Sequence, residues 1–115
     1  MISIIIPVFQ RPEMLEKTLD SVCAQTVKET EIIVVDDGST PTIRESLPRY
    51  CDDPRVTWIR QKNHGAPTAR NTGRRHAKGD FLIFWDADIT AKKDMLETML
   101  AALSEHKEAS YGYSD

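Results

Sequence analysis

Residues 31–39 read EIIVVDDGS, an apolar run that changes within one residue into an acidic pair and a turn. The β-branched residues from Ile32 to Val35 are typical of a strand that is covered on both faces. Asp36 and Asp37 follow directly, and the glycine and serine after them favour a turn. The stretch therefore predicts a buried strand of a parallel sheet with carboxylates at its carboxyl end.

Three further apolar runs occur along the chain, and segments with helical spacing separate all of them. The other predicted strands are Ile2–Val8, Val56–Arg60, which we place at an edge, and Phe81–Trp85. We predict a first helix from Arg11 to about Gln25 and a fourth directly after Asp88. The second helix is expected to begin at Pro41, with Ser39 or Thr40 as its cap and Ile43, Leu47 and Tyr50 on its inner face. The third is expected to run from Thr68 to Lys78, with Gly79 as a left-handed cap. Such alternation is typical of an α/β fold, here a Rossmann-like parallel sheet with helices on both faces. Ala109–Asp115 is expected to begin a fifth strand.

Length and charge limit the class of protein. The 115 residues carry 15 Lys and Arg against 18 Asp and Glu, a net charge of −3, which describes one domain spanning 1–115 and argues against nucleic acid as a partner. Since the apolar runs fall far short of the roughly 18 residues of a membrane span, we expect a cytoplasmic protein, or one peripheral to a membrane within a longer parent. Cys23 and Cys51 lack metal-binding spacing and are predicted to be buried free thiols.

Acidic residues follow two of the predicted strands, at the edge where open α/β sheets bind ligands. Besides Asp36 and Asp37, Asp86 and Asp88 follow the fourth strand. In an extended backbone these last two side chains point the same way, and their hard oxygen atoms suit Mg²⁺ or Mn²⁺, with water and a substrate phosphate completing the shell. The alternative is that Asp88 only caps the next helix, or that both are solvated turn residues.

The pair Asp36 and Asp37 has the chemistry to accept hydrogen bonds from a base imide or from ribose hydroxyls. Its alternative role is an Asx-type turn within the loop. Arg70, with Lys62 and His64 in the loop before its helix, would bring positive charge to a diphosphate, unless these are plain surface charges. The histidines stand without a second ligand at metal spacing, and we interpret them as structural or solvated.

Five motifs occur in a fixed order along the chain. They are SIIIPVF at 3–9, LDSVxxQT at 19–26, EIIVVDDGS at 31–39, ARN at 69–71, and KGD at 78–80 continuing to DAD at 86–88. In this order and spacing they resemble the family 2 glycosyltransferases, and the resemblance covers the whole chain. It implies a GT-A fold, a nucleotide-diphospho-sugar donor that usually carries UDP, a divalent metal, and inversion at the anomeric carbon of the transferred sugar.

The resemblance also implies roles for individual residues. Pro7 and Phe9 would line the nucleotide base, Asp37 with Asp36 close by would bind uracil or ribose, Asp86 and Asp88 would bind the donor and the metal, and Arg70 would contact the diphosphate. Family members place the catalytic base and the acceptor-binding segments beyond the point where this chain stops. We therefore assign no base and expect a truncated, N-terminal nucleotide-sugar-binding domain. Phe9-Gln10 stands where Tyr-Asn is usual, which leaves base stacking open, and Ile89 stands where a third acid often follows, which would weaken metal affinity.

Other functions fit parts of the sequence. One is a donor-binding piece that transfers nothing on its own; the sugar, the nucleotide base and the hydroxyl acceptor, a glycan or another molecule, stay open. DADIT at 86–90 matches the nucleophile motif of haloacid-dehalogenase-like phosphatases, in which Asp86 would be phosphorylated, although that motif normally follows the first strand. VVDD at 34–37 suggests a phospho-receiver domain, which also needs a strand-end lysine. If Phe81–Trp85 lies at a bare sheet edge, it predicts self-association.

Overall fold

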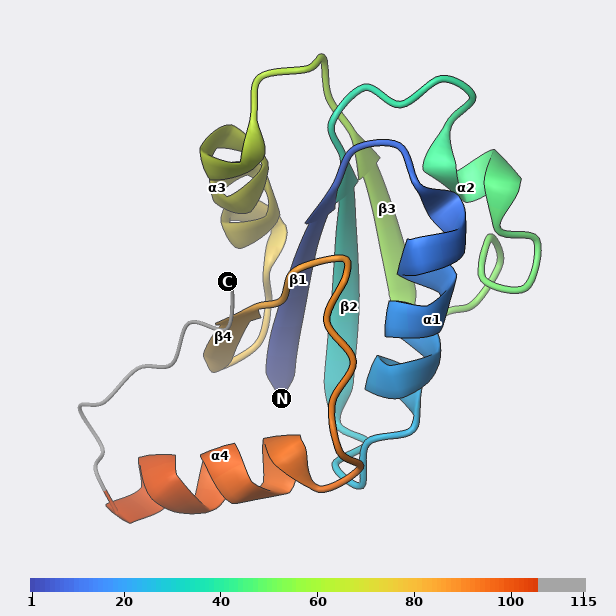
Figure 1. Cartoon of the computed structure of the whole chain (residues 1–115). Coiled ribbons are helices and arrows are strands. Elements are labelled where there is room, and N and C mark those ends of the chain that lie inside the picture. The colour runs from blue at the N-terminus through green and yellow to red at the C-terminus, as the bar shows by residue number, and fades with distance from the viewer. Residues whose placement is uncertain (106–115) are drawn as a thin grey trace.

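The computed structural model describes residues 1–105, in which four parallel strands form one sheet (Figure 1). The strands are β1 (Ile2–Val8), β2 (Thr30–Asp36), β3 (Val56–Arg60) and β4 (Phe81–Phe84), in the order β3-β2-β1-β4. The helices are α1 (Pro12–Cys23), α2 (Ile43–Ser46), α3 (Ala66–His76) and α4 (Met95–Glu105). The predicted α/β fold and its four strands are confirmed, with β3 at an edge. The predicted fifth strand, Ala109–Asp115, lies outside the described residues.

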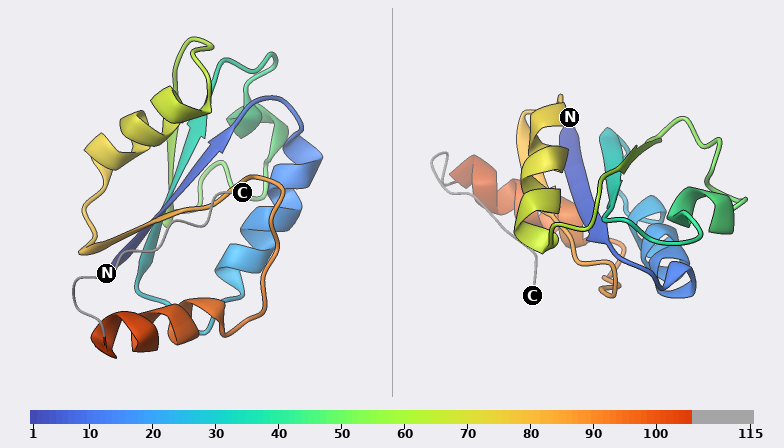
Figure 2. Two further views of the ribbon diagram at one scale, coloured as in Figure 1. Left: turned by 60° about the vertical axis from the view of Figure 1, so that its left-hand side comes forward. Right: turned by 90° about the horizontal axis from the view of Figure 1, so that it is seen from above.

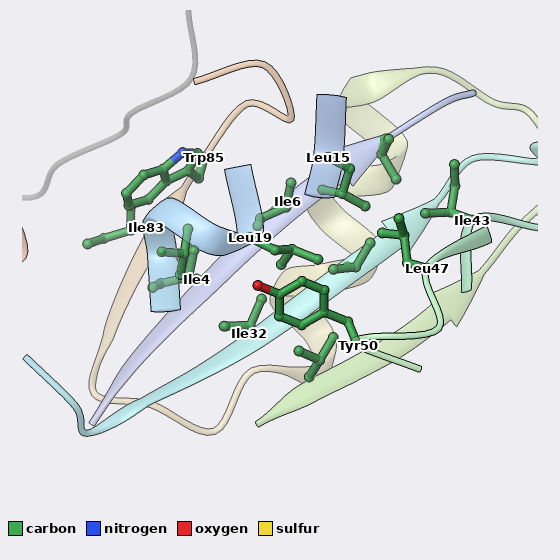
Figure 3. Close-up of a cluster of buried hydrophobic side chains, with 14 of the residues drawn as sticks. Ile4, Ile6, Leu15, Leu19, Ile32, Ile43, Leu47, Tyr50, Ile83 and Trp85 are labelled. Carbon is green, nitrogen blue, oxygen red and sulfur yellow. The ribbon is translucent and has the colours of Figure 1, made fainter. Parts of the chain in front are cut away.

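Helices cover both faces of the sheet, as the continuous apolar strands predict. Alternate residues of a strand point to opposite faces, so Ile4 and Ile6 of β1 enter the larger core cluster while Ile5 packs in a second cluster with Ala69 of α3. Figure 2 shows α3 on one side of the sheet and α1 with α2 on the other. The larger cluster, drawn in Figure 3, includes Leu15 and Leu19 of α1. The helix α4 lies at the end of the sheet where β1 begins (Figure 1).

The helix α3 packs close to the sheet because its inner face is small. A Cβ atom added at Gly73 would lie 2.4 Å from Cγ2 of Ile5, so a larger side chain has no room there. The predicted range of this helix is shifted: it begins at Ala66, with a proline in its first turn, and ends at His76. Gly79 is no left-handed cap, and its smallness serves a close approach instead, since an added Cβ would lie 2.6 Å from the Ser3 hydroxyl oxygen.

The helix α2 is shorter than predicted and has a different cap. Thr42 accepts a hydrogen bond from the backbone N–H of Glu45 at 3.3 Å, and the helix runs only over Ile43–Ser46. The predicted cap Ser39 is engaged elsewhere, because its hydroxyl accepts a hydrogen bond from the backbone N–H of Gln10 at 2.6 Å. The predicted buried residues Ile43, Leu47 and Tyr50 are confirmed.

The segment after β4 also differs from the prediction. Residues 86–94, here called the strap, have no regular secondary structure, and α4 begins at Met95 rather than directly after Asp88. Asp88 is therefore not the cap of that helix. Cys23 and Cys51 are free, as predicted, but each is half-buried rather than buried.

Candidate functional site

The carboxyl ends of the parallel strands meet at one edge of the sheet and bring the predicted site loops together. Val8 pairs with Asp36, so β1 and β2 end at the same level, and the backbone N–H of Asp37 donates to the carbonyl of Val8 at 2.8 Å. On the other side of β1, Phe84 pairs with Ile5, and Asp86 follows two residues later. The loops after β1 and β2 thus start beside one another, and the segment after β4 leaves the sheet on the other side of β1, from the level of Ile5.

Asp36 is buried and holds the loop after β2 in shape. Its Oδ1 accepts from the backbone N–H of Ser39 at 2.9 Å, and its Oδ2 accepts from the backbone N–H of Ile43 at 3.0 Å. The Nε atom of Arg60 lies 3.9 Å from the same Oδ2. Both carboxylate oxygens therefore serve the local fold, in the manner of the Asx-type turn that the sequence leaves open.

Asp37 is also buried, and it ties the loop after β2 to the loop after β3. Its Oδ1 accepts from Nε2 of Gln61 and from the backbone N–H of His64, both at 2.9 Å, and its Oδ2 accepts from the backbone N–H of Gly65 at 3.0 Å. Burial raises the pKa of Asp37, but these hydrogen bonds together outweigh it and hold the pKa below its ordinary value. Asp37 is consequently a fixed negative charge at neutral pH.

The loop after β1 presents an aromatic ring to solvent. Phe9 is 51% exposed, and Pro7 just before it is half-buried. The next two residues, Gln10 and Arg11, adopt left-handed backbone angles with φ of 58° and 59°. The side chain of Gln10 accepts from the backbone N–H of Thr40 at 2.9 Å, which fixes this loop to the loop after β2.

Asp86 and Asp88 stand at the start of the strap. Asp86 is half-buried and Asp88 is exposed. The backbone N–H of Ile89 donates to the carbonyl of Asp86 at 3.1 Å, so the two acids lie within one tight turn. Within residues 1–105 no three His, Cys, Asp or Glu side chains gather closely enough to hold a metal ion by themselves. A hard cation that keeps several waters and a substrate phosphate needs only one or two protein carboxylates, and Asp86 and Asp88 are two carboxylates within one turn.

The basic residues of the predicted site lie on and before α3. Arg70, in the first turns of the helix, is half-buried, and its Nε is buried with no hydrogen-bond partner among the described residues. Lys62 and His64 are exposed. Sequence reasoning missed Gln61, whose amide binds Asp37 and whose carbonyl oxygen accepts from Thr72 at 2.7 Å. Gln61 directly follows β3 at the same edge of the sheet, and this position in the sequence could have indicated that it belongs to the site.

Comparison with known proteins agrees with this arrangement. Residues 3–114 match the family described as Glycosyl transferase family 2. The chain belongs to this family. Glycosyltransferase GlyA of Streptococcus pneumoniae is 37% identical over 107 residues, which are 92% of this chain and 15% of GlyA, and validoxylamine A glucosyltransferase of Streptomyces hygroscopicus is 34% identical over 106 residues, 89% of this chain and 25% of that protein.

Solved structures show the same fold. S. aureus TarS 1-349, also solved with UDP and with UDP-GlcNAc, superposes with a TM-score of 0.82 at 28% identity, over 92% of this chain and 33% of that one. The mannosyltransferase PcManGT of Pyrobaculum calidifontis, solved with GDP-Man and Mn²⁺, gives 0.82 at 26% identity, over 90% and 32%. The sheet order and helices match these GT-A structures. This chain thus spans about a third or less of these proteins.

Membership in family 2 removes the grounds for the phosphatase and receiver interpretations. The strand before Asp86 is β4, at the edge of the sheet, rather than the first strand. Both carboxylates of the VVDD stretch bind backbone N–H groups, Asp36 in its own loop and Asp37 in the loop after β3. None of the helices within the described part of the chain is both long and apolar enough to cross a membrane.

Proposed function

We propose that this chain is the donor-binding domain of an inverting family 2 glycosyltransferase, which binds a nucleotide-diphospho-sugar, first of all a UDP-sugar, for transfer to an acceptor hydroxyl. The observation that carries the proposal is the meeting of an exposed aromatic loop, the Asp37 loop and the Asp86 turn at the carboxyl edge of one parallel sheet. Ligands of open α/β sheets bind at such an edge. The UDP and UDP-GlcNAc complexes of TarS support the choice of donor.

The base and ribose of the donor are assigned to the loops after β1 and β2. The exposed ring of Phe9, with the half-buried Pro7 two residues before it, offers an apolar surface for a base. Asp37 uses two acceptor positions on Oδ1 and one on Oδ2, and a carboxylate has about four in all. One position on Oδ2 is thus left for an imide N–H or a ribose hydroxyl. Asp36, whose oxygens serve its own loop, contributes by shaping that loop.

The diphosphate is assigned to the opposite side of β1. Asp86 and Asp88 would hold Mg²⁺ or Mn²⁺ together with the diphosphate oxygens, and the guanidinium of Arg70 supplies a further positive charge. When bound, the cation stabilises the negative charge that develops on the leaving nucleotide. The acidic pair of this chain would thus set where the diphosphate lies along the sheet edge.

Donor binding and sugar transfer are separate claims. Transfer also needs a base that takes the proton of the acceptor hydroxyl, and none of the described residues is assigned that role. The chain spans only 15% of GlyA and 33% of TarS 1-349. We therefore propose donor binding for the chain itself and inverting transfer for an enzyme of the length of its relatives.

Calorimetric titration tests donor binding. UDP is titrated into the chain with and without Mn²⁺, and Asp88→Asn is compared with Asp80→Asn, which makes the same charge change next to the amino end of β4. We expect Mn²⁺ to tighten UDP binding to the wild type and to Asp80→Asn, and Asp88→Asn to lose that gain, about tenfold or more in Kd. Equal Mn²⁺ gains in both variants would refute the assignment of the acidic pair.

A further inference from the structure

The strap, which carries Asp86 and Asp88, is held by side chains of α1 rather than by secondary structure of its own. Figure 2 shows the strap running beside α1 toward α4. Thr18, Ser21 and Gln25 all reach its backbone, and their spacing of three and four residues puts them on one side of the helix and its end. These three side chains are polar, yet Thr18 and Gln25 are fully buried.

Thr18 binds the peptide between the two acids. Its hydroxyl donates to the carbonyl of Ala87, the residue between Asp86 and Asp88. Because Thr18 is fully buried, its hydroxyl would be left without a partner if this bond were lost. From the other side, the indole N–H of Trp85 donates to the carbonyl of Ile89 at 2.7 Å. The acidic turn is thus fixed both from α1 and from the end of β4.

Ser21 and Gln25 fix the rest of the strap. The Ser21 hydroxyl accepts from the backbone N–H of Ala91 at 2.8 Å and lies 3.2 Å from the carbonyl of the same residue. Gln25 donates to the carbonyl of Lys92 at 2.7 Å and accepts from the backbone N–H of Leu96 at 3.0 Å. Each side chain therefore satisfies backbone groups that an irregular segment would otherwise leave open.

We propose that Thr18 and Ser21 are positioning residues for donor binding: by holding the strap against α1 they set the separation and direction of Asp86 and Asp88 toward a divalent cation on the donor diphosphate. This inference rests on the proposed function. An irregular segment offers many backbone conformations, and two carboxylates would hold one cation more tightly when both are fixed in place. The rigid surface of α1 supplies that order.

The test uses Thr18→Val, which keeps the shape and removes the hydroxyl, and Thr18→Ser, which keeps the hydroxyl. Val56→Ala on β3, the far edge of the sheet, is the control for lost stability. Two quantities are measured at a temperature where every variant is folded: the Mn²⁺-dependent gain in UDP affinity by calorimetry, and amide exchange of Ile89 and Ala91 by NMR without ligand.

We expect Thr18→Val to reduce the Mn²⁺-dependent gain in UDP affinity about tenfold and to keep the UDP affinity measured without Mn²⁺. The backbone amide of Ile89 should exchange faster in this variant. Thr18→Ser should restore both quantities, and Val56→Ala should change neither. If the wild type binds UDP with Mn²⁺ and Thr18→Val binds it equally well, this inference is wrong while the proposed function stands. A wild-type chain that binds no UDP with or without Mn²⁺ would overturn the proposed function and this inference with it, whatever the exchange rates.

Discussion

At the scale of single residues, the two consecutive aspartates at the end of β2 have different hydrogen-bond partners and different structural roles. Asp36 gives both oxygens to the loop that follows it, while Asp37 joins that loop to the one after β3. The sequence indicates that this acidic pair lies at a strand end, but not which of its members faces a ligand. That division depends on which backbone N–H groups the folded loops bring near each carboxylate. The groups that bind Asp36 are local, whereas one that binds Asp37 comes from Gly65, 28 positions away.

Asp37 makes stability depend on pH. Because its pKa is lowered by folding, its contribution is present above the unfolded value of about 3.9 and is lost as the pH falls below it. We expect Asp37→Asn to lower the free energy of unfolding at pH 7 by about 1–3 kcal/mol. The loss of stability between pH 7 and pH 3 should also be smaller in the variant. Urea unfolding at both pH values measures this, and an identical pH-dependent loss in the two proteins would contradict it.

Gly73 sets how close α3 approaches the sheet. We expect Gly73→Ala to lower the free energy of unfolding by about 1–3 kcal/mol, because the added methyl group meets Cγ2 of Ile5. Arg74→Ala, at an exposed position of the same helix, should change it by less than about 0.5 kcal/mol. Urea unfolding at pH 7 compares the two. Equal stability of Gly73→Ala and wild type would show that the helix can move outward at no cost.

At the scale of elements, strands were predictable and helix ends were not. Continuous β-branched runs such as Ile32 to Val35 have one good solution, burial on both faces, and the structure has it. Caps depend on atoms that tertiary contacts claim first: the hydroxyl of Ser39 binds the backbone of Gln10, and the cap of α2 therefore moves to Thr42. The strap has no periodic pattern, since its partners are side chains of α1.

The helix α4 depends on a residue of the distant α1 segment. Gln25 accepts from the backbone N–H of Leu96, one of the groups that a helix leaves open at its start. We expect Gln25→Ala to lower the free energy of unfolding by about 1–3 kcal/mol, because the buried N–H of Leu96 and the part-buried carbonyl of Lys92 lose their partner. Lys17→Ala, exposed on α1, is the matched control. Stability equal to that of the control would mean that α4 is held by its apolar contacts alone.

At the scale of the whole molecule, the sheet has an open edge beside the proposed diphosphate site. Among the described residues β4 pairs with β1 only, and Phe81 is 41% exposed. Such edges recruit further strands, and we expect a second copy of this chain to associate there. Light scattering at high concentration should show dimers or larger species. Phe81→Lys should reduce them, whereas Thr57→Lys on the other edge strand, β3, should not; a monodisperse wild-type monomer would contradict the expectation.

The central claim is that a metal-bound nucleotide lies at the carboxyl edge of the sheet, against Asp86 and Asp88. The most direct measurement is NMR of the isotopically labelled chain with UDP, in which Mn²⁺ broadens the signals of nearby amides. We predict UDP-dependent broadening of the amides at 86–88 and weaker broadening at Asp37, with Asp80 at the opposite end of β4 unaffected. Broadening centred on other carboxylates, or equal broadening with and without UDP, would contradict the account.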